Sequence, residues 1–459
     1  MPQSQTSRRS FLRQAAAVPF AFPAIRVISP FGPRSPNEKL NLAVVGTAGR
    51  AADNIQGVQG ENIAAICDID DRFLDAAAQK FPAAQKYHDF RKMLEQPKLD
   101  GIVVSTADHV HAPASVMAMK RGLHCYCEKP LAHNVREARV VAETAKANKV
   151  VTQMGTQIHA GDNYRRVVEL IQSGAIGPVR EVHVWCGKTW SQGERPKDTP
   201  PVPEYLYWDL WLGPAPERPY HPTYLPANWR RWWDFGSGTL GDMACHYMDL
   251  PFWALKLHEK APTRVESQGP PVHPETTPLW LIVQYQFPER GPNMPACKLT
   301  WYDHDKKPPL LAEKNLPKWN DGVLFVGDEG MLMADYGRRK LYPEEKFADF
   351  KAPEPTIPAS IGHHAEWIKA CKEGSPTTCP FDYSGPSPRP SCWATPPTGP
   401  ASGSTGTARR RQGGQLPGRR QVPEPGISEG LDALTSIPKA GDRRWDGSPG
   451  PSCRPSSPP

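Results

Sequence analysis

The hydrophobic pattern of residues 40–155 alternates short apolar runs with segments of helical periodicity. The apolar runs predict strands of a parallel sheet at 40–45, 63–67, 99–104, 124–127 and 150–154, and a further short strand is predicted at 86–88. The segments between them predict helices at 51–59, 71–81, 90–94, 113–121 and 134–148. Such strict alternation predicts an α/β fold, in which helices cover both faces of a doubly wound parallel sheet.

A different pattern follows residue 155. An amphipathic helix is predicted at 161–173 and a strand at 179–185, before a proline- and tryptophan-rich stretch at 186–235. A helix is then expected to begin near Asp242 and to continue to Leu257, and a late helix begins near residue 362. Further strands are predicted at 263–267, 279–287, 297–302, 323–326 and 330–334. These elements predict an α+β domain at 156–386 with an open, largely antiparallel sheet, which often mediates homo-oligomers.

A glycine-containing turn directly follows the first strand, with the sequence Gly46-Thr47-Ala48-Gly49-Arg50. The free amides of the next helix would point back at this turn, which suits a pyrophosphate. The usual G-x-G-x-x-G reads here as Gly46, Ala48 and Ala51, so Gly49 is expected to allow the close approach of the phosphates. Many strand–turn–helix units with two glycines bind nothing, and that alternative stays open.

Asp68 closes the second strand, and an acid at this place suits a hydrogen bond to the ribose 2'-hydroxyl of a dinucleotide. The cofactor of the domain at 38–155 is therefore predicted to be NAD. Arg50 and Arg72 would attract a 2'-phosphate, so NADP stays possible.

Polar residues follow three other strands of the predicted sheet, at the edge where ligands of parallel sheets bind. Ser105, Thr106 and His109 follow the fourth strand, and Gln157 follows the sixth. We expect them to line the nicotinamide side, although His109 is equally suited to cap the next helix.

The fifth strand runs into Glu128-Lys129-Pro130. Pro130 fixes the backbone there, so that Lys129 is expected to point off the ligand edge of the sheet. Its ammonium group would hydrogen-bond the cofactor or a substrate hydroxyl, and desolvation would lower its pKa toward the range of proton transfer. A solvated turn is the alternative.

Asp242 and His246 are four residues apart at a helix start, so their side chains share one face. An acid that orients an imidazole beside a lysine is a proton-relay arrangement, although such pairs are often only structural. The tryptophans before this motif, among them Trp232, would either pack on a sheet or form an aromatic wall for a sugar ring. Tyr164 lies on the apolar side of the helix at 161–173, and we take it with Trp232 as a candidate substrate contact.

Together these motifs resemble the glucose–fructose oxidoreductase, inositol dehydrogenase and MocA family over residues 40 to about 385. They are the glycine turn at 46–50, Asp68, Glu128-Lys129-Pro130, and residues 236–246. The resemblance implies catalytic roles for Lys129, Asp242 and His246, cofactor contacts from Glu128 and Lys129, and hydride transfer between a nicotinamide cofactor and a secondary alcohol of a sugar or cyclitol. An NAD-retaining glycoside hydrolase and a non-catalytic sugar-binding protein are the alternatives.

The excess positive charge of the chain lies at its two ends. The formal net charge is +7, residues 1–35 contain five arginines and no acidic residue, and residues 387–459 contain ten basic and five acidic residues. The net charge of the body is therefore about −3, which gives no support to a nucleic-acid or membrane partner. Ser7-Arg8-Arg9-Ser10-Phe11-Leu12-Arg13 before an apolar run resembles a twin-arginine export signal, which predicts a periplasmic or extracytoplasmic protein; a basic arm is the alternative. The ten cysteines show no second pair at zinc-ligand spacing, and no metal site is expected.

Periodic structure stops after Pro386, where proline, serine, glycine and arginine dominate. Residues 387–459 are predicted to be disordered. Codons compatible with this tail, shifted by one base, would encode an amphipathic helix and a short strand that resemble the family's C-terminal ending. We therefore predict a frameshift near Pro386.

Overall fold

The computed structural model describes residues 38–191 and 193–385. The predicted export signal at 1–35 and the predicted disordered, frameshifted tail at 387–459 lie outside the described residues. No helix in the described part of the chain is long and apolar enough to cross a membrane.

The first domain is built on a six-stranded parallel sheet with the order β3-β2-β1-β4-β5-β6. Every residue of β4 and β5 is buried, as expected of strands that are covered on both faces. The strands are β1 (Asn41–Val45), β2 (Asn62–Cys67), β3 (Gln85–Tyr87), β4 (Gly101–Val104), β5 (His124–Glu128) and β6 (Thr152–Gly155). This order confirms the predicted doubly wound sheet.

Helices cover both faces of this sheet. On one face α5 and α6 pack with α4, and on the other α2 and α3 share a core with the late helix α12. Their bounds are α2 (Arg50–Val58), α3 (Asp71–Lys80), α4 (Phe90–Met93), α5 (Asp108–Lys120), α6 (Val135–Asn148) and α12 (His363–Glu373). The helix expected to start at Pro113 starts five residues earlier. The prediction placed the helix start at Pro113 because proline favours the first turn of a helix. In the structure Pro113 lies inside α5 instead.

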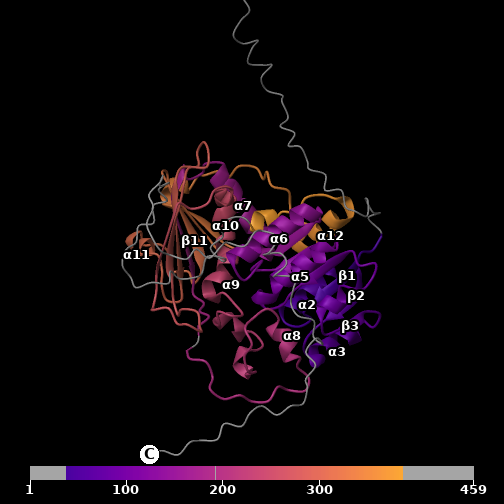
Figure 1. Ribbon diagram of the computed structural model, residues 1–459. Helices are drawn as coiled ribbons and strands as arrows, with labels where there is room; N and C mark the ends of the chain where they lie inside the picture. The colour runs from indigo at the N-terminus through magenta and orange to yellow at the C-terminus, as the bar shows by residue number, and fades with distance from the viewer. Residues whose placement is uncertain (1–37, 192, 386–459) are drawn as a thin grey trace, which may run out of the picture.

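The second domain contains a seven-stranded sheet with the order β13-β12-β11-β7-β10-β9-β8 (Figure 1). All neighbours are antiparallel except β7 and β10. The sequence pattern missed β13, whose Arg-Lys-Leu-Tyr sequence lacks an apolar run. The strands are β7 (Val179–Cys186), β8 (Arg264–Gln268), β9 (Ile282–Phe287), β10 (Cys297–Asp303), β11 (Gly322–Gly327), β12 (Met331–Ala334) and β13 (Arg339–Tyr342).

Three helices pack on one face of the second sheet and form the largest core cluster with it: α7 (Asp162–Gln172), α9 (Gly238–Tyr247) and α10 (Asp249–Ala254). The short helix α11 (Leu310–Glu313) contributes Leu311 to a smaller cluster on the other face. Helix α9 lies between the two sheets, so its side chains can reach the ligand edge of the first domain (Figure 1).

The proline- and tryptophan-rich stretch returns to the first domain before it reaches α9. It contains α8 (Trp208–Leu212) and two short 3-10 helices, Pro222–Tyr224 and Asn228–Arg231. Trp208, Trp211, Trp229 and Trp232 belong to a buried cluster that packs against Ile69 and Ala107. The backbone amide of Tyr207 donates to the carbonyl of Ile69 at 2.9 Å, beside the end of β2. The stretch therefore joins the two domains.

The last described helices also bring the chain back to the first domain. Helix α12 ends at Gly374, which has a left-handed backbone with φ of 69°. Helix α13 (Phe381–Ser384) packs on α6 and β6. The part of the chain that the pattern assigned to the second domain thus completes the cover of the first sheet.

Candidate active site

The glycine turn after β1 has the shape that a pyrophosphate site requires. Gly46 has φ of 85°, and a Cβ there would lie 2.4 Å from the carbonyl oxygen of Ser105. Gly49, with φ of 59°, precedes α2, and no side chain caps the amides of that helix. The amides of Ala51 and Ala52 already donate to the carbonyls of Ala48 and Gly49, at 3.2 Å and 3.1 Å. The positive end of α2 nevertheless faces a turn without side-chain obstruction at Gly49, so the residues present fit a dinucleotide.

Asp68 directly follows β2 and lies next to the glycine turn. Its Oδ2 accepts hydrogen bonds from the amide and the hydroxyl of Thr47, both at 2.8 Å. Burial raises the pKa of Asp68, and the hydrogen bonds from Thr47 only partly oppose this shift. Arg72 makes a bidentate ion pair with Asp70, and its guanidinium lies 3.7 Å from the ring centre of Tyr205. Arg72 is thereby held away from the role of a phosphate ligand.

Glu128 joins several predicted cofactor residues into one network. Its Oε1 accepts from Arg50 Nε at 3.2 Å, from Asn54 Nδ2 at 3.0 Å and from Gln157 Nε2 at 2.7 Å. Asn54 Nδ2 also donates to Ser105 Oγ at 2.9 Å. The network links the glycine turn to the ends of β4, β5 and β6. Sequence reasoning missed Asn54, because a buried polar residue inside an amphipathic helix gives no signal until its partners are known.

The residues after β4 make contacts with backbone carbonyls, and no side chain caps the start of α5. Both ring nitrogens of the buried His109 lie near backbone carbonyls, those of Trp211 at 3.0 Å and Phe235 at 3.3 Å. The structure thus places His109 against the tryptophan-rich stretch. The Thr106 hydroxyl donates to the Ala107 carbonyl at 3.1 Å.

Lys129 and Asp242 meet at the end of β5. Lys129 Nζ donates to Asp242 Oδ1 at 2.6 Å and to its backbone carbonyl at 3.0 Å. Both side chains are largely buried, with 11% and 6% of their surface exposed. The ring of His111 supports this arrangement, since its Nδ1 lies 2.7 Å from the carbonyl of Pro130.

The protonation of this pair differs from the expectation. Burial lowers the pKa of Lys129, but the charge of Asp242 and the hydrogen bond to it prevail, so the pKa of Lys129 is raised. Burial raises the pKa of Asp242, but Lys129 and Arg230 outweigh it and hold that pKa far below its usual value. The expected lowering of the Lys129 pKa is therefore wrong, because the sequence pattern could not show the ion pair.

Asp242 contacts other partners than His246. Its Oδ1 also accepts from Arg230 Nε at 2.9 Å, and its Oδ2 accepts from Trp190 Nε1 at 2.6 Å. Within residues 38–191 and 193–385, no hydrogen bond joins Asp242 to His246. The expectation that Asp242 orients this imidazole is corrected: Asp242 holds Lys129. Trp190 and Arg230 were missed, because they lie in an aperiodic stretch.

His246 lies one turn further along α9 and is only partly buried. Its ring nitrogens have no hydrogen-bond partner in the described part of the chain. Burial and the positive charge of Lys129 lower the pKa of His246 to about 3. The imidazole is therefore neutral near pH 7, with a nitrogen able to accept a proton from a bound molecule.

The two residues suggested as substrate contacts are both fully buried. Tyr164 donates its hydroxyl to the His246 carbonyl at 3.0 Å, and so supports the backbone of α9. Trp232 packs in the tryptophan-rich cluster with none of its surface exposed. In this structure both act on the site through packing.

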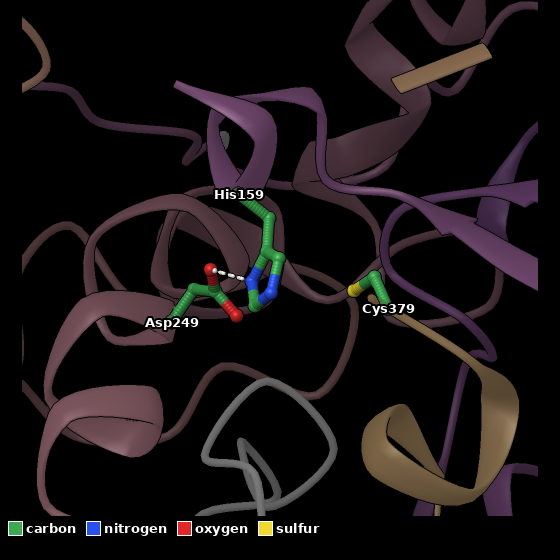
Figure 2. Close-up of side chains that lie close together, drawn as sticks. All are labelled: His159, Asp249 and Cys379. Carbon is green, nitrogen blue, oxygen red and sulfur yellow. Dashed lines mark hydrogen bonds and ion pairs between the residues drawn. The ribbon is translucent and has the colours of Figure 1, made fainter. Parts of the chain in front are cut away.

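His159, Asp249 and Cys379 form the group of potential metal ligands that the described residues contain (Figure 2). His159 Nδ1 lies 2.7 Å from Asp249 Oδ2, and Tyr383 donates its hydroxyl to Asp249 Oδ1 at 3.0 Å. Both carboxylate oxygens thus already have protein partners. The group ties the chain near α13 to α10.

Comparisons with known proteins agree with this architecture. Residues 40–156 match the model of an oxidoreductase family described by its NAD-binding Rossmann fold, and residues 161–295 match the C-terminal alpha/beta domain of the same family. The two matches together cover more than half of the chain.

Two inositol dehydrogenases are among the similar curated proteins. The myo-inositol 2-dehydrogenase of Thermotoga maritima is 27% identical over 139 residues, which are 30% of this chain and 41% of that protein. The inositol 2-dehydrogenase of Rubrobacter xylanophilus is 28% identical over 149 residues, which are 31% and 43%. The chain thus matches less than half the length of these relatives.

Solved structures share the fold at low identity. The WlbA dehydrogenase of Bordetella pertussis, in complex with NADH and UDP-GlcNAcA, has a TM-score of 0.55 and 16% identity, and the match covers 78% of this chain and 94% of that one. The WlbA dehydrogenase of Chromobacterium violaceum has a TM-score of 0.53 and 18% identity, with 77% and 92% covered. With its two family domains and its dinucleotide turn, the chain belongs to the glucose–fructose oxidoreductase, inositol dehydrogenase and MocA family of oxidoreductases, and its first domain is an NAD-binding Rossmann domain.

Proposed function

We propose that the protein is an NAD-dependent dehydrogenase that transfers a hydride between nicotinamide and a secondary alcohol of a sugar or cyclitol. The observation that carries this proposal is the pairing of a charged, anchored Lys129 with a neutral, unpartnered His246 beside the NAD-binding domain. The inositol dehydrogenases among the relatives agree with the substrate class.

The two side chains divide the proton chemistry between them. In this proposal His246 Nδ1 or Nε2 accepts the hydrogen bond of the reacting hydroxyl and then its proton, since burial and Lys129 lower the pKa of His246 and keep the imidazole neutral near pH 7. Lys129 stays protonated and donates a hydrogen bond to the same oxygen, which stabilises the negative charge that develops there. Asp242 acts as a positioning residue that keeps Lys129 charged and in place. Bound NAD supplies the hydride acceptor.

NADH formation in the presence of a panel of sugars and cyclitols tests the proposal. Accumulation of NADH with one of them, at a rate proportional to enzyme, is the expected result. Release of sugar from a glycoside without net NADH would instead favour a retained-cofactor glycosidase. If folded protein shows neither activity, a non-catalytic sugar-binding role remains. A mass spectrum of co-purified small molecules helps to choose the panel.

We also propose export through the twin-arginine route and a homo-oligomer formed through the second sheet. The paired arginines Arg8 and Arg9 support export, and the open seven-stranded sheet supports assembly. Replacing both arginines by lysine should keep a tagged protein in the cytoplasm, and light scattering gives the oligomeric state.

A further inference from the structure

Positive side chains gather around Trp190, next to the Lys129–Asp242 pair. Lys188 Nζ lies 5.7 Å from the ring centre of Trp190, and the guanidinium carbons of Arg230 and Arg231 lie 5.5 Å and 5.7 Å from it. Trp190 itself donates to Asp242, which also receives Lys129 and Arg230. Four cations thus lie around one indole and one carboxylate.

Asp242 is the ion-pair partner of both Lys129 and Arg230 in the described part of the chain. Asp108 is the second acid close to Arg230 and Lys129, but it is buried, and burial raises the pKa of Asp108 to about 8. It therefore holds its proton near pH 7 and adds no charge. The exposed Lys188 makes no ion pair with any residue of the described ranges. An anion bound beside Lys188 and Arg230 would therefore be attracted by their positive charges.

Arg230 is suited to bind such an anion directly. Its guanidinium lies 4.1 Å from the ring centre of Trp229, and Trp190 flanks it as well. Nε donates to Asp242, and Nη1 donates weakly to the Ala227 carbonyl at 3.4 Å. Nη2 has no hydrogen bond within the described part of the chain, and 21% of the side chain is exposed. A planar, oriented guanidinium with free donors is typical of carboxylate and phosphate recognition.

We infer that Arg230 and Lys188 form a subsite for an anionic group of the substrate, a carboxylate or a phosphate carried by the sugar. The subsite adjoins the reaction site, because Arg230 and Lys129 donate to the same oxygen of Asp242. An acidic sugar bound there would place its ring beside Lys129. This inference rests on the proposed dehydrogenase function and narrows its substrate class.

The test compares hexuronates and hexose phosphates with their neutral parent hexoses. Binding to the full chain in the presence of NADH is measured by calorimetry, at low and at high salt. We expect the anionic member of at least one pair to bind about tenfold more tightly at low salt, and the advantage to shrink as salt screens the charges. The uronate and phosphate arms show which anion the subsite prefers.

Charge variants locate the effect. Arg230→Lys keeps a positive charge beside Asp242 but loses the planar fork, and should weaken binding of the anion about tenfold. Lys188→Met should weaken it about fivefold, and as an exposed change it should leave folding intact. Binding of the neutral hexose should be unchanged in Lys188→Met. Lys340→Met on the edge strand β13 is the control for the loss of an exposed lysine beside an aromatic ring: Lys340 Nζ lies 5.7 Å from the ring centre of Tyr342, although unlike Lys188 it is paired with Glu344.

Equal binding of acidic and neutral sugars, or an unchanged preference in both charge variants, would overturn the subsite. NADH formation from neutral polyols alone would also overturn the anion subsite, but it would support the proposed dehydrogenase function. Charge-dependent binding of the anion without NADH from any compound would support the subsite and refute the dehydrogenase.

Discussion

Replacing Lys129 by methionine removes the ammonium group from the end of β5 and keeps a side chain of similar length. In the native protein this ammonium donates to both the carboxylate and the backbone carbonyl of Asp242. If it also donates to the reacting oxygen, its loss removes the stabilisation of developing negative charge there. We therefore expect turnover to fall by about two to four powers of ten, or about 3–5 kcal/mol in the barrier.

The loss of stability should be smaller than the loss of activity. A buried charge without any partner would cost about 3–5 kcal/mol. Asp242, however, keeps Arg230 at 2.9 Å and Trp190 at 2.6 Å in the variant. We expect the free energy of unfolding to fall by only about 1–2 kcal/mol, which a domain of ordinary stability survives.

Steady-state NADH formation and thermal unfolding, measured on the same preparations, separate the two effects. Lys129→Arg is the matched control, because it restores a positive charge with a different shape and should recover only part of the activity. A fully active Lys129→Met enzyme would refute the assigned role. A variant that unfolds at the assay temperature would refute the argument that Arg230 and Trp190 suffice to hold Asp242.

Three further predictions follow from the site. Asp68→Ala should weaken NAD binding about tenfold and reduce the preference over NADP, as measured by titration of both cofactors; a wild type that binds NADP more tightly, with no loss in the variant, would contradict it. Gly46→Ala should abolish NAD binding and lower the melting temperature, because the new Cβ would lie 2.4 Å from the Ser105 carbonyl; normal binding would disprove the close approach. Burial and Lys129 lower the pKa of His246 from 6.5 to about 3. Between these two pH values the imidazole is protonated in the unfolded chain but neutral in the native protein. The free energy of unfolding should therefore decrease as pH falls from about 6.5 toward 3. The melting temperature should fall less steeply with decreasing pH in His246→Gln than in the wild type. Identical pH dependence in the two proteins would contradict the lowered pKa of His246.

The sequence alone determined the elements whose periodicity is strong. The apolar runs at 40–45 and 99–104 became central strands of the parallel sheet, because strands covered on both faces are apolar along their whole length. The edge strand β3 is short and largely exposed. The same pattern placed Gly46, Asp68 and Lys129 at the carboxyl ends of strands, where chain connectivity alone brings them to one edge. Local signals of this kind need no partner distant in the chain.

Tertiary structure decided which side chains meet and how they are charged. Asp242 and Lys129 are 113 residues apart, so the sign of the Lys129 pKa shift depends on a contact that no local pattern contains. Trp190 and Arg230 come from an aperiodic stretch, and only the folding of this stretch around α9 brings them to Asp242. Electrostatic and hydrogen-bond energies depend on distance in space, whereas the pattern of polar and apolar residues reports only distance along the chain. The proposed anion subsite could therefore be recognised only in the folded protein.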